Sequence, residues 1–452
     1  MKQLKAITIL AILLILILLP INTALAAEID TNDYNPDNLT TNSPSIFLMD
    51  ADTGKILYSK NPFEKHYPAS TTKMMTAILT LENCELDDIV TVSHNAIFSI
   101  PVGYSHANLQ EGERLTVEQL LNVLLIPSAN DAAIALAEHI AGSEEAFIDM
   151  MNNKAKELGC INTHFVNPNG IHNEDHYSTA YDLALIGKYA MQFDEIMEIA
   201  TINQYTLPKT NKYDKENRIF NTTNGLIDTD NEYYYPNATG IKTGYTDKSG
   251  YCIVATAEKD GVTLLLSVLG SETLEERYED CIKLFDYGFE NYSHQNLINA
   301  NDVVNTLEID GATKETKSLD VVAKDTINVL VKNNVDISTL EPQIEISENL
   351  KAPIAQDSVI GKISYEIDGE TYSTDLLAGS TVVPSNFEVI VFRVLLIFLI
   401  LYLLVITLKK LNKPRKPRGS SSTYIVKHSK NSKRTKSKKG GRYKFTQIHD
   451  FL

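Results

Sequence analysis

The spacing of apolar positions predicts a β-hairpin followed by several helices in the first half of the chain. Two short apolar stretches, Ile46–Met49 and Ile56–Tyr58, flank Asp52-Thr53-Gly54 and predict the hairpin. Apolar residues then recur at helical spacing, which predicts helices at residues 70–81, 116–126, 131–141, 144–158 and 179–191. The hairpin therefore leads into a largely helical segment.

The pattern changes to strands further along. Apolar runs at 239–246, 250–258 and 262–269 are separated by turn residues, among them Asp260-Gly261, and a helix is predicted at 272–287. A hairpin, a helical insert, three strands and a helix in this order are typical of an antiparallel sheet with helices on its faces. We therefore expect an α+β domain over residues 45–292.

A second pattern follows, with short alternating Val, Ile and Leu segments such as Ile327–Val331 and Val359–Tyr365. Asp368-Gly369 marks a further hairpin turn. Residues 296–383 are predicted to form a small all-β domain, and no catalytic cluster is expected in it.

The N-terminus has the pattern of a secretory signal over residues 1–26. Met1–Lys5 is basic, Ala6–Leu19 is apolar, and Thr23–Ala27 offers small residues for cleavage. An uncleaved anchor is the alternative. Residues 27–44 are rich in Asn, Asp and Thr and are interpreted as a flexible lead-in.

Residues 389–408 form an apolar run whose one charge is Arg393. As a helix it would extend for about 30 Å, the thickness of a hydrocarbon core. Fifteen Lys and Arg follow it in residues 409–452, against the single acid Asp450, although the whole chain carries a net charge of -17. The positive-inside rule then predicts a transmembrane helix in the cell membrane, a cytoplasmic basic tail and an extracytoplasmic acidic body. A charge run beside a span is usually topological, so no nucleic-acid partner is expected.

The sequence gives only weak signals for a metal site or for disulfide bonds. The four cysteines are allowed to pair in an exported body, but they match no zinc spacing and are expected to be buried thiols. The polar loop 161–178 contains His172, Glu174, Asp175 and His176, for which a metal site and a solvated loop are the two interpretations. Because no ligand spacing is met, we expect the solvated loop, and no metal or cofactor.

Ser70 and Lys73 form the chain's one Ser-x-x-Lys, at the start of a predicted helix. At i,i+3 on one face, the hydroxyl and the amine would be close enough to share a proton. A serine needs such a base, because its hydroxyl is a poor nucleophile at neutral pH. The alternative is a helix cap with a solvated first-turn lysine.

Two further motifs gain weight from their position. Ser128 and Asn130 lie in a polar break between two apolar helices, and Lys242-Thr243-Gly244 lies on a predicted strand. The lysine and threonine offer a charge and a hydroxyl to a carboxylate, and the glycine lets a ligand approach the strand edge. Ser-x-x-Lys, Ser-x-Asn and Lys-Thr-Gly in this order are the motif set of penicillin-binding proteins and class A β-lactamases.

More closely, the chain resembles the low-molecular-mass D-alanyl-D-alanine carboxypeptidases, the serine peptidases of family S11 that trim peptidoglycan stem peptides and bind penicillin. The resemblance covers about residues 45–380 and is carried by Tyr67–Lys73, Leu125–Ala133, Gly240–Thr246 and Gly250–Cys252. It implies a penicillin-binding/β-lactamase-like fold and removal of the terminal D-alanine from stem pentapeptides, with β-lactam antibiotics as covalent inhibitors.

The resemblance also implies a role for each motif residue. Ser70 would attack the peptide carbonyl while neutral Lys73 takes its proton, and Ser128, linked to a lysine, would protonate the departing amine. Asn130 would hold the substrate amide, and the N–H groups of Ser70 and Tyr245 would form the oxyanion hole. The terminal carboxylate would be received by Lys242 and Thr243, with Gly244 beside them and Arg277 assisting. A salt bridge on the helix surface is the alternative for Arg277.

Two other functions remain open at this stage. A β-lactamase-like hydrolase would need a deacylating glutamate after the Ser-x-Asn, for which Glu174 is the candidate, without the flanking pattern that we would expect. A weakly active scaffold that binds the cell wall would keep the pocket but turn over little substrate.

Overall fold

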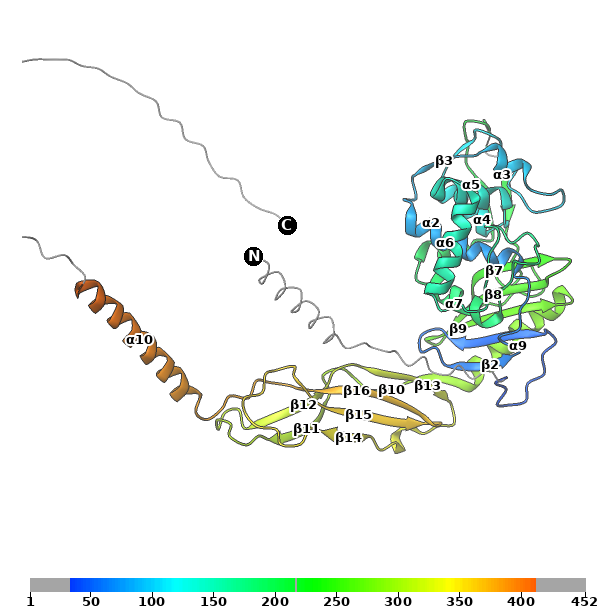
Figure 1. Ribbon diagram of the computed structural model, residues 1–452. Helices are drawn as coiled ribbons and strands as arrows, with labels where there is room; N and C mark the ends of the chain where they lie inside the picture. Colours follow the sequence, from blue (N-terminus) through cyan, green and yellow to red (C-terminus); the bar gives the residue numbers. More distant parts are fainter. Residues whose placement is uncertain (1–32, 216–217, 412–452) are drawn as a thin grey trace, which may run out of the picture. The chain divides into compact units, whose positions relative to one another are not determined.

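The computed structural model describes residues 33–215 and 218–411. Its central sheet has five antiparallel strands in the order β2-β1-β9-β8-β7 (Figure 1). The strands are β1 (Ser45–Asp50), β2 (Ile56–Lys60), β7 (Ala238–Thr246), β8 (Gly250–Lys259) and β9 (Val262–Ser271). The first hairpin is thus joined to the three later strands through β9, which confirms the predicted antiparallel sheet.

The segment between β2 and β7 is largely helical, as predicted. Its helices are α2 (Lys73–Asn83), α3 (His94–Phe98), α4 (Val117–Leu125), α5 (Asn130–Ala141), α6 (Glu144–Glu157), α7 (Ala180–Ala190) and α8 (Asp194–Ala200). Two small hairpins accompany them, β3 (Ile89–Thr91) with β4 (Arg114–Thr116), and β5 (Gln204–Leu207) with β6 (Arg218–Asn221). Helix α9 (Leu274–Asn291) follows the sheet.

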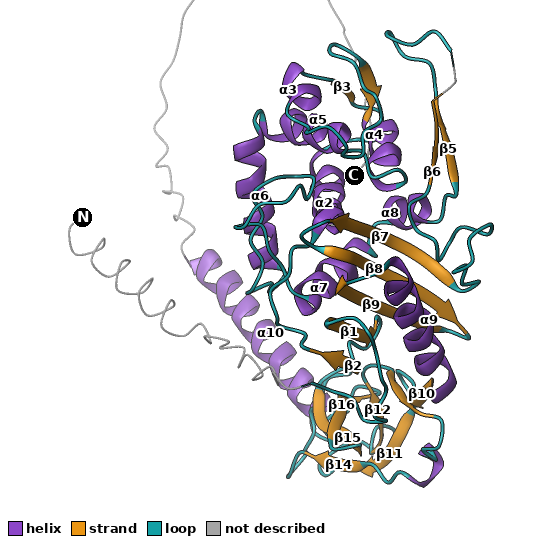
Figure 2. Cartoon of the chain, turned by 90° about the vertical axis from the view of Figure 1, so that its right-hand side faces the viewer, coloured by secondary structure: helices purple, strands orange, loops and turns teal. Residues whose placement is uncertain are grey.

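The sheet is covered on both faces (Figure 2). Successive side chains of a strand point to opposite faces. Accordingly, Cys252 and Val254 of β8 belong to the core that includes side chains of α2, α5 and α7, whereas Ile253 and Ala255 belong to the core that includes side chains of α9. The alternation of two buried sets explains why β8 is apolar over most of its length.

The predicted β domain begins at Tyr292, four residues before the expected boundary. Strands β10 (Tyr292–Ile298) and β13 (Ile327–Lys332) pair, and a five-stranded sheet has the order β11-β12-β16-β15-β14. The strands of the five-stranded sheet are β11 (Val303–Glu308), β12 (Ser318–Ala323), β14 (Gln343–Ile346), β15 (Val359–Ile367) and β16 (Glu370–Ala378). A 3₁₀ turn, η2 (Ile337–Thr339), precedes β14. The apolar side chains of this β domain form a hydrophobic core of their own.

The segment predicted as a flexible lead-in is held in place where the structure describes it. The backbone N–H groups of Asn42 and Ser43 donate to the carboxylate of Asp280 on α9, and Asp37 pairs with Lys332 on β13 at 3.0 Å. Polar side chains suggested a free segment, but they are the partners that fix it. The flexible-lead-in prediction is therefore wrong for residues 33–44.

Helix α10 (Phe387–Leu411) belongs to a second compact unit that begins at Val383. Within it, Val389–Lys409 is long and apolar enough to cross a membrane. The predicted signal peptide and the basic tail beyond residue 411 lie outside the described residues.

Candidate active site

Ser70 lies in a short 3₁₀ turn, η1 (Ala69–Thr72), that immediately precedes α2. The predicted single α-helix from Ser70 is therefore wrong in detail, because α2 begins at Lys73. The turn nevertheless brings the two side chains together, with Lys73 Nζ 2.9 Å from Ser70 Oγ. The sequence prediction of a hydroxyl beside an amine is confirmed.

Lys73 is fully buried and surrounded by oxygen atoms. Its Nζ lies 2.7 Å from Asn130 Oδ1 and 2.6 Å from the carbonyl oxygen of Asn169. Burial, and secondarily the charge of Lys242, lower the pKa of Lys73 well below its ordinary value. A neutral amine has two N–H groups for the two carbonyl acceptors and keeps its lone pair for the Ser70 hydroxyl proton. The interpretation of Lys73 as a solvated lysine is excluded.

Two glycines allow other segments to press against the Ser70 turn. A Cβ at Gly244 of β7 would lie 2.9 Å from the backbone nitrogen of Ser70 and 3.0 Å from Pro68 O. A Cβ at Gly170, whose φ is +83°, would overlap the carbonyl group of Ala69. Gly244 was expected to admit a ligand; in the structure its missing side chain makes room for the backbone of Ser70.

If Ser70 is acylated by penicillin, as the resemblance implies, we expect Gly170→Ala to slow that acylation by roughly 100-fold, because the new methyl group must push Ala69 and the serine turn out of place. Gly142→Ala is the matched control, since Gly142 has a φ of +78° and open space around its Cβ position. Stopped-flow labelling with a fluorescent penicillin measures both variants. Equal acylation rates in the two would contradict a role of Gly170 in placing Ser70.

Ser128 and Asn130 lie where α4 gives way to α5, as the predicted polar break requires. Ser128 has a positive φ of 64°, and its buried Oγ makes no hydrogen bond to the described residues. The expected hydrogen bond between Ser128 and a lysine is therefore not found among the described residues. Asn130 joins Lys73 to the carbonyl oxygen of Ser105, to which its Nδ2 donates at 2.8 Å.

Asp131, which the sequence analysis missed, holds the loop opposite β7. Its buried carboxylate accepts from the backbone N–H groups of Ala107 and Leu109 at 2.9 and 3.0 Å. Burial raises the pKa of Asp131, and the backbone donors oppose that shift. Asp131 follows Asn130 directly, so one turn of α5 positions both Lys73 and the loop containing Ser105.

Two more buried cations lie beside the cleft, Lys242 on the Lys-Thr-Gly strand and Arg277 on α9. Lys242 is 1 % exposed and its Nζ donates to Thr243 O, while Thr243 Oγ1 lies 2.7 Å from Thr223 Oγ1. Burial, with the Arg277 charge as a second cause, lowers the pKa of Lys242 to about 7. Arg277 is 3 % exposed and its Nε has no partner within the described residues. The surface salt bridge considered for Arg277 is therefore wrong.

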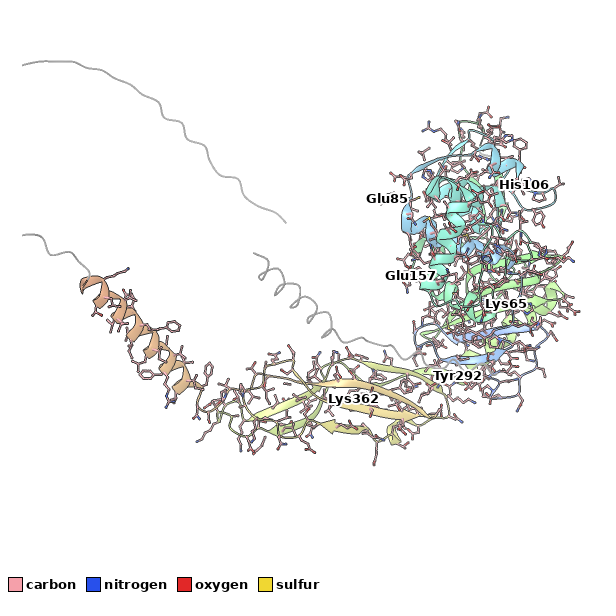
Figure 3. All side chains as sticks on the ribbon, in the orientation of Figure 1. Lys65, Glu85, His106, Glu157, Tyr292 and Lys362 are labelled. Atoms are coloured by element: carbon pink, nitrogen blue, oxygen red, sulfur yellow. The ribbon has the colours of Figure 1, made fainter. Side chains whose placement is uncertain are left out.

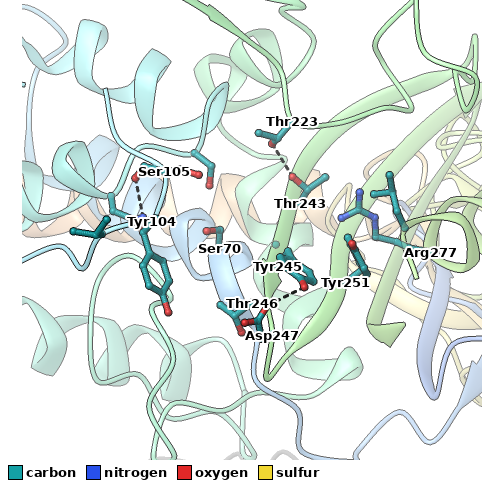
Figure 4. Close-up of a pocket in the computed structure, with 16 residues that line it drawn as sticks. Ser70, Tyr104, Ser105, Thr223, Thr243, Tyr245, Thr246, Asp247, Tyr251 and Arg277 are labelled. Atoms are coloured by element: carbon teal, nitrogen blue, oxygen red, sulfur yellow. Dashed lines mark hydrogen bonds between the residues drawn. The ribbon is translucent and has the colours of Figure 1, made fainter. Parts of the chain in front are cut away.

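Several of these groups line a cleft of about 530 Å³, although Lys73 and Lys242 are not among its lining residues. Figure 4 shows Ser70 between the loop of Tyr104 and Ser105 on one side and β7, with Thr243 and Tyr245, on the other. Arg277 lies beyond Tyr251 at the far side of β7. The lining includes Ser70, Ser128, Asn130, Thr223, Thr243, Gly244, Tyr245 and Arg277. All the predicted motifs thus meet at one cleft.

The loop 161–178 is solvated only in part: residues 173–175 are exposed, as expected, whereas residues 168–170 and His176 are buried behind the site. His176 is buried, with Nε2 2.8 Å from Thr72 Oγ1 and Nδ1 accepting from Val166 N–H. Burial lowers the pKa of His176 to about 3, so this histidine is neutral. Glu174 is exposed and is not among the residues that line the cleft, which argues against a β-lactamase role.

Comparison with known proteins gives consistent matches over the described body of the chain. A family model for D-alanyl-D-alanine carboxypeptidase, peptidase S11, matches residues 31–273, and one for the C-terminal domain of penicillin-binding protein 5 matches residues 292–384. The D-alanyl-D-alanine carboxypeptidase DacF of Bacillus subtilis is 35% identical over 346 residues, which are 75% of this chain and 85% of the relative. The carboxypeptidase DacA of Escherichia coli is 30% identical over 359 residues, or 78% and 86%.

Solved structures agree with these sequence matches. Penicillin-binding protein 5 from Haemophilus influenzae is 29% identical, with a TM-score of 0.64 over 77% of this chain and 99% of that one. The Streptomyces K15 DD-transpeptidase is 34% identical, with a TM-score of 0.52 over 56% of this chain and 98% of that one.

Proposed function

The chain belongs to the D-alanyl-D-alanine carboxypeptidase family of serine peptidases, and from this membership we propose how its residues divide the reaction. The protein is a low-molecular-mass penicillin-binding protein that acts on peptidoglycan. The single observation that carries the proposal is the buried Lys73 amine 2.9 Å from Ser70 Oγ.

We propose that Lys73 is the base of acylation. The Ser70 hydroxyl proton moves to the lone pair of Nζ while Oγ forms a bond to the carbonyl carbon between the last two D-alanines. The carbon–nitrogen bond then breaks, and the departing D-alanine amine takes the proton that Lys73 received, relayed through Ser128, whose buried Oγ has no hydrogen-bond partner among the described residues. Water hydrolyses the ester, which frees Ser70 and the shortened peptide.

The backbone N–H groups of Ser70 and Tyr245 are proposed to stabilise the negative oxygen of the tetrahedral intermediate. The support is the close approach at Gly244, which brings β7 within van der Waals contact of the Ser70 nitrogen. Such donors typically lower the barrier by a few kcal/mol. Asn130 is proposed to hold Lys73 and the Ser105 loop in position, in addition to contacting the substrate amide that the resemblance assigns to it.

The substrate's terminal carboxylate is proposed to bind at Lys242, Thr243 and Arg277. Burial is the main cause of the lowered pKa of Lys242, and the charge of Arg277 is the second; an anion between the two cations would relieve the repulsion between them. The unpartnered Nε of Arg277 is a free donor at this place. A substrate without a C-terminal carboxylate should therefore bind poorly.

The function is tested by mass spectrometry of the full-length chain, purified in detergent, after incubation with diacetyl-Lys-D-Ala-D-Ala. We expect loss of one terminal D-alanine, and no product after pretreatment with penicillin. A protein that binds penicillin covalently yet releases no D-alanine from this peptide or from intact peptidoglycan would support the scaffold alternative.

The affinity for the peptide should depend on the charge of Lys242. Because its pKa is lowered to about 7, the ammonium form dominates below pH 7 and is lost above it, so kcat/KM should fall as pH rises through that range. In Lys242→Arg the guanidinium keeps its charge, and the alkaline fall should move to higher pH. Initial rates at fixed ionic strength between pH 5 and 10 measure the profile. If the alkaline limb does not move in Lys242→Arg, it results from the titration of a group other than Lys242.

We also propose that residues 389–408 anchor the protein in the cell membrane as a single span. The support is the length and apolar composition of Val389–Lys409. The basic residues beyond it favour a cytoplasmic tail and an extracytoplasmic catalytic domain. Protease added outside intact cells should digest the catalytic domain and spare an epitope at the C-terminus; digestion of the epitope would reverse the orientation.

A further inference from the structure

Helices α2 and α5, which begin at the catalytic cleft, both end at a cluster that no step of the reaction uses. Lys73 and Asn130 are their first residues, and the side chains of these two bond to each other. At the other ends, Cys84 caps α2 and His139 lies in the last turn of α5. Asp88, four residues after Cys84, is the third member of the cluster.

The donor atoms of Cys84, Asp88 and His139 all lie within 4.8 Å of one another. Thiolate, imidazole and carboxylate ligands around a zinc ion would be roughly 3.3–3.7 Å apart, given bond lengths of about 2.0–2.3 Å. Small side-chain rotations therefore suffice to close the set around one ion. The linear spacing of these residues matches no zinc motif, so the sequence analysis had no signal for this cluster.

The three donors are free to bind an ion. Neither the Cys84 thiol nor the His139 ring makes a hydrogen bond to the described residues, and the Asp88 carboxylate accepts one, from Glu85 N–H at 2.9 Å. Cys84 is partly exposed, and Asp88 and His139 are exposed, so an ion can enter from solvent. Three side chains from two segments, the α2–β3 connection and α5, thus bring unpartnered or half-partnered donor atoms together.

The electrostatic surroundings independently favour a cation. Between Lys73 and Lys154 the sequence has one Lys or Arg, Arg114, against twelve Asp and Glu. The C-terminal ends of two helices carry partial negative charge, and neither α2 nor α5 has a lysine or arginine in its last turn. Glu82 is already paired with Lys154 at 2.9 Å and does not compete for the ion.

We propose that Cys84, Asp88 and His139 bind a zinc ion, with water as the fourth ligand. A thiolate and an imidazole favour zinc over magnesium or calcium, which prefer oxygen ligands. The site is separate from the cleft. Glu85, the neighbour of Cys84, and His106, close to the cleft loop, lie on opposite sides of the helical part (Figure 3), and α2 spans about 16 Å between Lys73 and its end.

Cobalt(II) is a suitable probe, because a cobalt–thiolate bond gives a near-ultraviolet charge-transfer band. The full-length protein, reduced and stripped with EDTA, should bind one cobalt ion with this band and lose it on addition of equimolar zinc. Cys84→Ser should lose the band. His139→Ala should bind zinc more weakly by at least about 100-fold, because even partners outside the ligand shell contribute 10- to 100-fold.

His94→Ala is the matched control, since His94 is another exposed histidine beside an acid, Glu111. It should keep the band and the zinc affinity. Circular dichroism checks that every variant is folded. A second group, Asp50, Asp52 and His294, has donor atoms equally close but no thiol, so cobalt bound there would give no charge-transfer band. Absence of the band in the wild type, or its persistence in Cys84→Ser, would overturn the proposal.

Discussion

Ser70→Ala is expected to abolish covalent penicillin labelling and to reduce D-alanine release to the background rate. The variant removes the proposed nucleophile, Ser70 Oγ, while Lys73, Asn130 and the cleft stay in place. Nucleophile removal in enzymes of this type costs on the order of 10⁴-fold or more. Labelling is measured by intact-protein mass spectrometry, and D-alanine release by a coupled assay.

The variant should keep its fold, which separates loss of chemistry from loss of structure. Ser70 is half-buried and its Oγ has a hydrogen bond with Lys73 alone among the described residues, so its removal leaves no other hydrogen bond unmade. The melting temperature is expected to stay within about 2 °C of the wild type, as for a surface substitution. Stoichiometric penicillin labelling in folded Ser70→Ala would remove Ser70 from its assigned role.

Much of the fold was predictable because its elements are amphipathic and its turns carry their usual residues. The three strands from 238 to 271 and helices α4 to α7 were predicted within a few residues of their observed ends. The three motifs could be recognised as one set because few other combinations of residues perform the same chemistry. The proximity of the Ser70 and Lys73 side chains was predicted correctly, although it arises from a 3₁₀ turn and not from a single helix.

The remaining parts of the site depend on backbone contacts between distant segments, which leave no periodic pattern. Asn169 acts through its carbonyl oxygen, a group that every residue has. Gly170 acts through the side chain that it lacks. His176 was recognised as a polar residue, but whether such a residue faces solvent or the back of α2 depends on how the loop folds over Thr72.

Residues 33–44 were mispredicted for the same physical reason. A segment rich in Asn, Asp and Thr has too little apolar surface to predict burial, and the usual inference is flexibility. Here the partners are the buried carboxylate of Asp280 and the ammonium of Lys332, which lie more than 200 residues away in sequence. Only the folded arrangement brings them to the segment.

Lys73→Ala is the second large effect that we expect, with penicillin acylation slowed about 10²- to 10⁴-fold at neutral pH. Without the amine, the Ser70 proton has no acceptor within hydrogen-bond distance among the described residues. Lys65→Ala is the matched control, because Lys65 is an exposed lysine a few residues before the serine turn and should be dispensable. Stopped-flow acylation compares the three proteins.

The pH dependence distinguishes a base from a merely structural lysine. Since burial lowers the pKa of Lys73, its neutral form persists at pH values where an exposed lysine is charged. The base is lost as pH falls through that lowered pKa, so wild-type acylation should decrease toward acid pH. The residual acylation of Lys73→Ala should lack this acid limb, because the group that titrates is gone. A variant that is slow but keeps the wild-type acid limb would show that another group is the base, and that Lys73 serves to hold Asn130 and the loop of Asn169 around the serine.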